Sequence, residues 1–341
     1  MNRQIAHNLE AIQTLLVSPQ KIMITCHNKP DGDAIGASLG LYHYLQKKGH
    51  EVKVVVPTAY PEGLHFLDGD ETVVVAEESV DEAKAIFEAS KIVFCLDFNA
   101  LYRVKHLGDL INASTDHLKI MIDHHLDPQP FYDYCLWDTK ATSTAELVYR
   151  FIELMSDQAL IDETLATCLY LGIATDTGRF KYGVHGNGIF EVMSVLMNTG
   201  IDLTALNERI FDNVTLNEIN FLGHALSNLL VFLEEYNTAI LAISQEDFKQ
   251  FDLDAHTYES GALIGRLMSI QGVNCLALLI DRGDLIKISF RSKGNINVNE
   301  IAHKYFEGGG HKNASGGRSE LTLEETVNKI KMLLPDYEEV L

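Results

Sequence analysis

The chain contains few cysteines, and their placement excludes a fold held by disulfides. Its 341 residues include five, at positions 26, 95, 135, 168 and 275, and no Cys-x-x-Cys pair. An odd number of scattered thiols within apolar runs argues against a disulfide framework or a zinc ribbon. Reduced thiols are instead typical of a cytoplasmic protein.

Long apolar runs are also missing. No stretch approaches the roughly 20 apolar residues that a membrane span requires, and the N-terminal Met-Asn-Arg-Gln-Ile-Ala-His lacks the apolar core of a signal peptide. With only 7 prolines, 46% hydrophobic and 22% charged residues, the composition is that of a globular protein. We therefore expect a folded, cytoplasmic protein with no membrane partner.

Basic residues are scarce as well. Lysine and arginine number 27 against 48 acidic residues, which gives a formal net charge of −21. This balance disfavours a broad basic surface for long double-stranded nucleic acid. A small anionic substrate stays compatible, because metal ions or arginines can reverse the field inside one cleft. No Gly-x-Gly-x-x-Gly follows the first predicted strand, which argues against a nicotinamide-dependent oxidoreductase.

The first half of the chain alternates buried strands with helices. Strands are predicted at 21–26, 51–56, 72–75, 91–97 and 118–123, and helices at 4–17, 34–48, 80–89, 142–155, 160–174 and 186–198. This alternation predicts an α/β fold with a doubly wound, mostly parallel sheet.

A second, smaller α/β unit is predicted after a helical stretch at 202–233. Its strands are expected at 238–243, 273–280 and 285–290, the last two as a hairpin, and its helices at about 258–270, 297–305 and 323–334. The length of the chain also favours two domains. We therefore predict a catalytic domain at 1–200, a helical linker at 201–237 and a second domain at 238–341.

Acids and imidazoles gather where the predicted strands end. The strand at 118–123 ends in an acid and is followed by two histidines. Three other segments also carry acids or a histidine at or just after their apolar stretch. The residues concerned are His27, Asp31 and Asp33; Asp97; Asp123, His124 and His125; and Asp176, which follows a helical stretch. In an open parallel sheet, the carboxyl ends of the strands form the ligand-binding crevice. We therefore expect these segments to converge.

The residue types in this cluster indicate a metal centre. Carboxylates and imidazoles without thiolate favour a hard or borderline divalent ion, with Mn²⁺ ahead of Mg²⁺. The number of candidate ligands is larger than one ion needs. Two ions roughly 3.5–4 Å apart would activate water to hydroxide and clamp a phosphoryl group. The pattern predicts phosphoester hydrolysis.

Each of these features also has a purely structural explanation. A pair such as Asp31 and Asp33 is common in turns, and acids such as Asp97 and Asp123 often cap the next helix. A lone histidine such as His27 is more often a core or surface residue than a ligand. The expected convergence of four segments favours the metal centre over these alternatives.

The ordered motifs also carry a resemblance. His-x-x-x-Asp-x-Asp at 27–33, Asp97, Asp-His-His at 123–125 and Asp176 resemble the four motifs of the DHH phosphoesterase superfamily. Gly-Gly-Gly-His-Lys-Asn-Ala-Ser-Gly at 308–316 resembles the signature of the DHHA1 domain. The whole arrangement is most similar to the bifunctional oligoribonuclease and PAP phosphatase family, the nano-RNase A group. The resemblance implies a DHH domain, a DHHA1 domain and an active site in the cleft between them.

The resemblance also implies residue roles. One ion would be held by His27, Asp31 and Asp97, and a second by Asp33, Asp97, His124 and Asp176, with Asp97 as the bridge. Asp123 would orient the neighbouring histidine, and His125 would contact the substrate phosphate or assist proton transfer.

In the second domain, the resemblance assigns substrate binding to Arg291, Gly309, Gly310 and His311. Successive glycines can expose N–H groups to a phosphate, and an arginine can add a forked contact. Without the resemblance, the glycines would indicate a flexible loop and Arg291 a surface residue. Arg179 departs from the family, which commonly has an aromatic or small residue after Thr-Asp-Thr-Gly; substrate preference is the property this departure affects.

The resemblance therefore implies a manganese-dependent phosphoesterase, with Mg²⁺ as the other candidate ion. Its partners would be short oligoribonucleotides, cut to mononucleotides, and 3′-phosphoadenosine 5′-phosphate (PAP), which would lose its 3′-phosphate. Alternative activities are hydrolysis of the linear dinucleotide pApA, of a cyclic dinucleotide, or of single strands by an exonuclease. A non-catalytic nucleotide-binding regulator is the alternative of another class.

Overall fold

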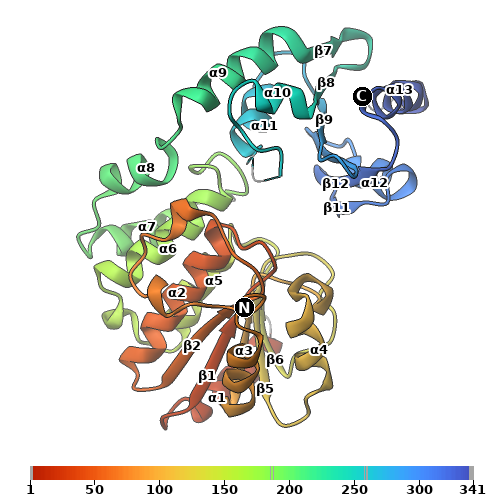
Figure 1. Cartoon of the computed structure of the whole chain (residues 1–341). Coiled ribbons are helices and arrows are strands. Elements are labelled where there is room, and N and C mark those ends of the chain that lie inside the picture. The colour runs from red at the N-terminus through yellow and green to blue at the C-terminus, as the bar shows by residue number, and fades with distance from the viewer. Residues whose placement is uncertain (1–2, 185, 187, 257, 259, 338–341) are drawn as a thin grey trace. The chain divides into compact units, whose positions relative to one another are not determined.

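The computed structural model describes residues 3–184, 186, 188–256, 258 and 260–337. The chain divides into two compact units, residues 1–213 and 214–341, which are described separately below (Figure 1). Within the described residues, every helix falls short of the length and hydropathy needed to cross a bilayer.

The first unit is built on a six-stranded parallel sheet. Its strands are β1 (Lys21–Thr25), β2 (Glu51–Val56), β3 (Val74–Val75), β4 (Ile92–Leu96), β5 (Leu118–Asp123) and β6 (Tyr134–Trp137). Their order is β3-β2-β1-β4-β5-β6, and all neighbours run parallel. The predicted doubly wound sheet is confirmed. The strand order reverses between β1 and β4, and such a switch point is where this architecture binds ligands.

Both faces of this sheet are covered, which explains the continuous apolar strands. In β4 all five residues are buried. Phe94 faces a core shared with helices α2 (Gly32–Lys47), α5 (Thr144–Leu154), α6 (Glu163–Asp176) and α7 (Gly188–Met197). Val93 faces a core shared with α3 (Val80–Ala89) and α4 (His106–Ala113). Parallel strands buried on both faces read as unbroken apolar runs.

The helices of the first unit mostly follow the predicted pattern. They are α1 (Arg3–Leu15), α2 (Gly32–Lys47), α3 (Val80–Ala89), α4 (His106–Ala113), α5 (Thr144–Leu154), α6 (Glu163–Asp176), α7 (Gly188–Met197) and α8 (Leu203–Phe211). Helix α4 was not predicted, and Leu107 and Ile111 bury its apolar side.

Helices α2 and α6 pack unusually closely through glycines. A Cβ on Gly36 would lie 2.5 Å from the Cys168 carbonyl oxygen, and one on Gly32 would overlap the Thr175 side chain. On α6, a Cβ on Gly172 would lie 2.8 Å from Asp33 Oδ1. The close approach places the start of α2 beside the end of α6, where Asp176 lies.

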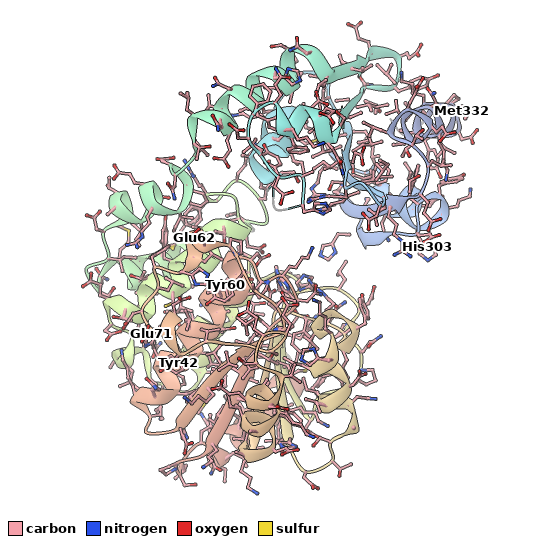
Figure 2. All side chains as sticks on the ribbon, in the orientation of Figure 1. Tyr42, Tyr60, Glu62, Glu71, His303 and Met332 are labelled. Atoms are coloured by element: carbon pink, nitrogen blue, oxygen red, sulfur yellow. The ribbon has the colours of Figure 1, made fainter. Side chains whose placement is uncertain are left out.

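The connection after β2 is fixed by its own polar contacts. Tyr60, one of the residues that Figure 2 labels, is buried and donates its phenol hydrogen to Asp70 Oδ1 at 2.5 Å. Its ring stacks on His65 with a centroid distance of 4.5 Å, and His65 Nδ1 lies 2.9 Å from Asp70 Oδ2. These contacts order a segment that contains little regular structure.

The second unit contains a mixed sheet. Its strands are β7 (Leu230–Leu233), β8 (Thr238–Ile243), β9 (Cys275–Asp281), β10 (Ile286–Ser292), β11 (Gly309–His311) and β12 (Ala314–Ser319), in the order β11-β12-β10-β9-β8-β7. β8 and β9 are parallel and the other pairs antiparallel. Its helices are α9 (Leu216–His224), α10 (Gln245–Lys249), α11 (Gly261–Met268), α12 (Val298–Tyr305) and α13 (Leu323–Leu333).

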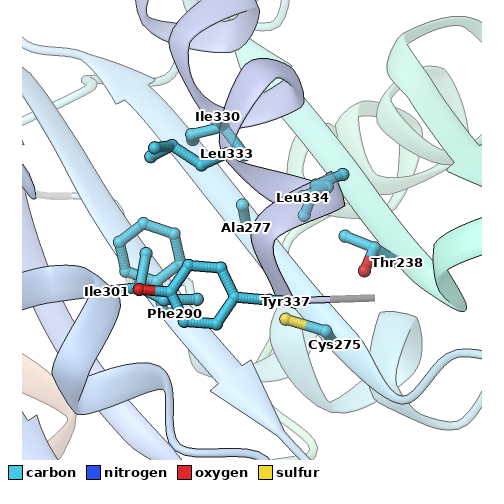
Figure 3. A pocket seen from close by; sticks show the side chains of 9 residues that line it. All are labelled: Thr238, Cys275, Ala277, Phe290, Ile301, Ile330, Leu333, Leu334 and Tyr337. Atoms are coloured by element: carbon cyan, nitrogen blue, oxygen red, sulfur yellow. The ribbon is translucent and has the colours of Figure 1, made fainter. Parts of the chain in front are cut away.

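The core of the second unit holds a very small cavity. It measures about 10 Å³, and its lining includes Cys275, Phe290 and Tyr337 (Figure 3). This space is about the size of one water molecule, and its lining is apolar. The cavity is therefore a packing defect rather than a ligand site.

One prediction about local structure is wrong, and one alternative considered for the glycines does not hold. Residues 202–233 were expected to be helical, but a π-helical turn at Ala225–Leu229 leads into β7, which pairs with β8. The glycines before His311 were read alone as a flexible loop, but Gly309 and Gly310 lie in β11. In both segments, pairing with a neighbouring strand outweighs local preference.

Candidate metal centre

His27 follows β1 and turns one ring nitrogen toward two acids. Its Nδ1 lies 2.9 Å from the Asn28 carbonyl oxygen, to which it can donate. Its Nε2 lies 3.3 Å from Asp97 Oδ2 and 3.7 Å from Asp31 Oδ1. A carbonyl on one ring nitrogen fixes the tautomer that leaves the other nitrogen able to bind a metal.

Asp31 both caps a helix and belongs to the cluster. Its Oδ1 accepts hydrogen bonds from the backbone N–H groups of Asp33 and Ala34, each at 3.1 Å, at the start of α2. Helix capping was the structural alternative considered for Asp97 and Asp123, whereas for Asp31 it was a turn; the cap found here does not exclude metal binding. The cap holds the carboxylate beside His27.

Asp33 is buried and held by the first turn of α5. Its Oδ2 accepts from the Thr144 N–H at 2.6 Å, and its Oδ1 from the Ala145 N–H at 2.8 Å. A helix N-terminus stabilises negative charge through these N–H groups. The position of the carboxylate is thus fixed by α2 and α5 together.

Asp97 occupies the centre of the cluster. It follows β4 with a φ of 61°, in the left-handed region that is uncommon for residues other than glycine. Its N–H donates to the Ile122 carbonyl at 3.1 Å, and its Oδ1 accepts from Thr144 Oγ1 at 2.9 Å. The next helical turn begins only after Ala100, so this acid is not a helix cap.

The two adjacent histidines both face the acids, because β5 ends at Asp123. His124 Nε2 lies 3.5 Å from Asp176 Oδ2, 3.7 Å from Asp97 Oδ1 and 4.0 Å from Asp33 Oδ2. His125 Nδ1 lies 2.8 Å from Asp123 Oδ1 and 3.5 Å from Asp97 Oδ1. The structure therefore pairs Asp123 with His125.

Three overlapping groups could hold a metal ion. They are His27 with Asp31 and Asp97; Asp33 with His124 and Asp176; and Asp97 with His124 and His125. Within each group the potential ligand atoms lie within 4.8 Å of one another. All six residues predicted as ligands are brought together, and Asp97 belongs to two groups. Oxygen and imidazole donors suit a hard or borderline divalent cation.

Two of the acids are held in an environment that disfavours their charge. Burial, together with the charges of Asp97, Asp176 and Asp31, raises the pKa of Asp33 well above its ordinary value. Burial and the charges of Asp97 and Asp31 raise the pKa of Asp176 to about 8. A bound cation would remove this repulsion, so the donor set fits a divalent ion.

Asp97 and His27 behave in the opposite way. Burial acts to raise the pKa of Asp97, but its hydrogen bond and charge interaction with His27, with smaller effects from His125 and His124, hold it well below its ordinary value. Burial acts to lower the pKa of His27, but Asp31 and Asp97 raise it to about 10. Asp97 is thus the acid most firmly kept ionised.

Sequence reasoning missed Thr144, whose backbone holds Asp33 and whose hydroxyl holds Asp97. A signal for its position was present, because Ser143 and Glu146 have the spacing of a helix N-terminus. Ser143 is the N-cap of α5, and Glu146 Oε2 accepts from the Thr142 N–H at 2.8 Å. What the pattern could not show is that this helix points at two acids.

Arg179, the departure from the family pattern, lies against the end of α8. Its guanidinium is 4.2 Å from the centroid of the Phe211 ring, and its Nη2 is 3.1 Å from Asp212 Oδ1. Positive φ values at Gly178, Arg179 and Phe180 turn the chain sharply after Asp176. The arginine thus ties the segment after Asp176 to the end of the first unit.

In the second unit, Arg291 and His311 both lie opposite Ala314. Arg291 is in β10 and His311 in β11, on either side of β12, so their side chains share one face of the sheet. The glycines permit close pairing: a Cβ on Gly310, whose φ is 147°, would lie 2.6 Å from the Ala314 carbonyl oxygen. Gly309 and Gly310 are thus strand residues beside His311.

The strand order and the cluster at its switch point define an α/β protein with a candidate metal centre. The chain matches the N-terminal domain of the DHH family over residues 21–173 and the DHHA1 domain over residues 236–337. It belongs to the DHH family of phosphoesterase hydrolases. This membership confirms the prediction made from the sequence motifs.

Several particular proteins are similar to this chain. An exopolyphosphatase-related protein from Bacteroides fragilis is 33% identical, with a TM-score of 0.95 over 100% of this chain and 99% of that one. The bifunctional oligoribonuclease and PAP phosphatase NrnA of Bacillus subtilis is 28% identical over 86% of this chain and 88% of its own length. Exonuclease RecJ bound to manganese shares the fold, with 14% identity, a TM-score of 0.53 and coverage of 99% and 95%.

Proposed function

We propose that this protein hydrolyses short oligoribonucleotides to mononucleotides and removes the 3′-phosphate of PAP. The observation that carries the proposal is the convergence of four segments, with Asp97 at their centre, at the switch point of the sheet. The NrnA proteins of Bacillus subtilis and Thermus thermophilus support the substrates, because each is 28% identical to most of this chain. The net charge of −21 suits short substrates better than long ones.

We assign two divalent ions, Mn²⁺ ahead of Mg²⁺, to the cluster. One would be held by His27, Asp31 and Asp97, and the other by Asp33, Asp97, His124 and Asp176. Such ions supply Lewis-acid charge and lower the pKa of a water molecule. The chain prepares their ligands: the Asn28 carbonyl fixes the His27 tautomer, and the start of α5 fixes Asp33.

His125 would contact the substrate, and Asp123 would position His125. The bond between His125 Nδ1 and Asp123 Oδ1, at 2.8 Å, makes Nδ1 the donor, so we assign Nε2 to the substrate. Asp123 is fully buried, so it holds the ring direction. With the ring protonated on both nitrogens, Nε2–H would donate to a phosphate oxygen or pass its proton to the leaving oxygen, and Nδ1–H would stay bonded to Asp123.

The second unit would hold the rest of the substrate. Arg291 and His311 share one face of the sheet, and Gly309 and Gly310 lie next to His311 in β11. We assign these four residues to a substrate phosphate. The domain limits that accompany this assignment are 1–200 for the catalytic domain, 201–237 for the linker and 238–341 for the second domain.

We also propose a cytoplasmic location, because the cysteines are free and reduced thiols are typical of the cytoplasm.

A second candidate is hydrolysis of a cyclic or linear dinucleotide. The cyclic-di-AMP phosphodiesterase GdpP of Geobacillus thermodenitrificans is 24% identical over 98% of this chain, although this chain spans only 50% of that protein. A non-catalytic regulator would be expected to lose a ligand, whereas all six predicted ligands are present.

The test is a substrate panel with the purified protein and Mn²⁺. The panel contains pApA, a 5′-phosphorylated five-mer, a long single strand, PAP, cyclic di-AMP and pyrophosphate. Fast turnover of pApA, the five-mer and PAP is expected. Preferential release of mononucleotides from the long strand would contradict the proposal. Preference for cyclic di-AMP, or turnover of pApA without turnover of the five-mer and PAP, would favour the second candidate.

A further inference from the structure

Trp137, the only tryptophan of the chain, lies beside the candidate metal centre. It is the last residue of β6 and pairs in register with Asp123, the last residue of β5. Both residues therefore stand at the carboxyl edge of the sheet, where the acids converge. Sequence reasoning gave this residue no role.

The indole is fixed to the backbone of His125. Its Nε1–H donates to the His125 carbonyl oxygen at 2.7 Å. The side chain of the same histidine reaches Asp97 Oδ1 with its Nδ1 at 3.5 Å. A single residue thus connects the indole to the centre of the cluster.

The remaining surface of the indole is apolar and partly open. Trp137 is 37% exposed, and Leu126, which follows His125, is 49% exposed. The N–H is already bonded within the protein, so the exposed part of Trp137 offers mainly its ring. A rigid aromatic ring at the edge of a polar site is suited to contact a flat, apolar group.

We propose that Trp137 stacks on a nucleobase of the substrate and thereby sets a preference for purines. This inference rests on the proposed function, because a phosphoryl group at the acids would carry a nucleoside beside them. Every nucleobase has a face that can stack on an aromatic side chain, and larger bases offer more area. Trp137 would contact the substrate without taking part in proton transfer.

Intrinsic fluorescence tests the contact directly, since Trp137 is the sole tryptophan. The full-length protein is titrated in Mg²⁺ buffer with AMP and, as the probe without a base, ribose 5-phosphate. Saturable quenching by AMP, with little change from ribose 5-phosphate, is expected. If AMP inhibits hydrolysis of pApA but leaves the fluorescence unchanged, the contact is absent and the inference is wrong.

Two substitutions separate stacking from a purely structural role of the indole. Trp137→Leu removes the ring, and Trp137→Phe keeps a ring but loses the N–H. Trp137→Leu should lower kcat/KM for pApA about tenfold, mainly through KM, and should lower it less for pUpU. Trp137→Phe should retain most of the purine preference. Equal losses for pApA and pUpU in Trp137→Leu would indicate that Trp137 only positions His125.

The outcomes distinguish this inference from the proposed function. If the wild-type protein cleaves neither dinucleotide, the proposed function fails, while quenching by AMP would still support the base contact. If cleavage occurs but quenching and the pApA preference are both absent, only the inference about Trp137 fails.

Discussion

The two ends of helix α2 hold acids in opposite ways. At its N-terminal end, Asp33 and Asp176 lie among other acids, and burial and repulsion raise their pKa values. Near its C-terminal end, Asp157 Oδ2 accepts hydrogen bonds from Tyr44 Oη at 2.6 Å and Lys48 Nζ at 2.8 Å. There the protein itself neutralises the acid.

This difference separates a binding site from a structural contact. A carboxylate removed from water normally has enough donors or cations around it, and the half-buried Asp157 does. A cluster in which acids crowd one another is unfavourable unless something else binds there. The contrast predicts that changes at the first end alter activity and metal binding, whereas changes at the other end alter only stability.

The largest effect is expected from Asp97→Asn. Asp97 belongs to two of the possible metal groups, so the loss of its charge should weaken both. We expect kcat/KM to fall at least about 10³-fold on every substrate, measured at saturating Mn²⁺. Asp81→Asn, at an exposed acid on α3, is the matched control and should retain activity. Turnover close to wild type in Asp97→Asn would rule out the bridging role.

Metal addition should stabilise the protein through the same cluster. A ligand at 100 times its dissociation constant adds about 2.7 kcal/mol, which corresponds to about 5–10 °C in Tm for a unit of this size. Thermal melting with EDTA and with Mn²⁺ measures the shift. Asp157→Asn should show the full shift and Asp97→Asn little of it. An equal Tm shift in both variants would contradict the proposed difference between the two ends of α2.

A smaller effect is expected when the support of Asp97 is removed. Thr144→Val deletes the hydroxyl that donates to Asp97 Oδ1 at 2.9 Å but keeps the backbone bond to Asp33. Loss of such a supporting contact typically costs about 10–100-fold in metal affinity or activity. The Mn²⁺ dependence of the rate should shift accordingly, and Thr144→Ser should restore it. An unchanged Mn²⁺ dependence in Thr144→Val would show that the hydroxyl is irrelevant.

The smallest effect is expected at the structural end. Although burial acts to raise the pKa of Asp157, hydrogen bonds from Lys48 and Tyr44 lower it. A carboxyl whose pKa is lowered in the folded state stabilises the fold at any pH above its ordinary, unfolded-state pKa of about 3.9. This stabilisation is lost as the pH falls through the folded-state pKa. Asp157→Asn should therefore cost about 1 kcal/mol at pH 7 and less near pH 3. Urea unfolding at both pH values tests this, and a cost that grows toward low pH would contradict it.

Much of the fold and the clustering of the candidate site residues could be predicted, because both depend on repeating patterns. Apolar strands that end in acids gave the doubly wound sheet and the cluster of metal-binding residue types. The edge strands β6, β7 and β11 were missed, as was β12 beside β11, since their pairing is decided by neighbours distant in sequence.

The contacts that position the site residues could be inferred from the sequence only in part. The spacing of Gly32, Gly36 and Gly40 placed three small residues on one side of α2, a pattern that did not enter the prediction. The positive φ of Asp97 and the contact between Trp137 and His125 have no signature in the sequence, because each depends on how separate strands end side by side.

Anomalous diffraction at the manganese edge, from crystals grown with Mn²⁺, tests the central claim most directly. The account predicts two peaks that share Asp97, one beside His27 and Asp31 and the other beside Asp33, His124 and Asp176. A single peak, or peaks that do not contact Asp97, would contradict it.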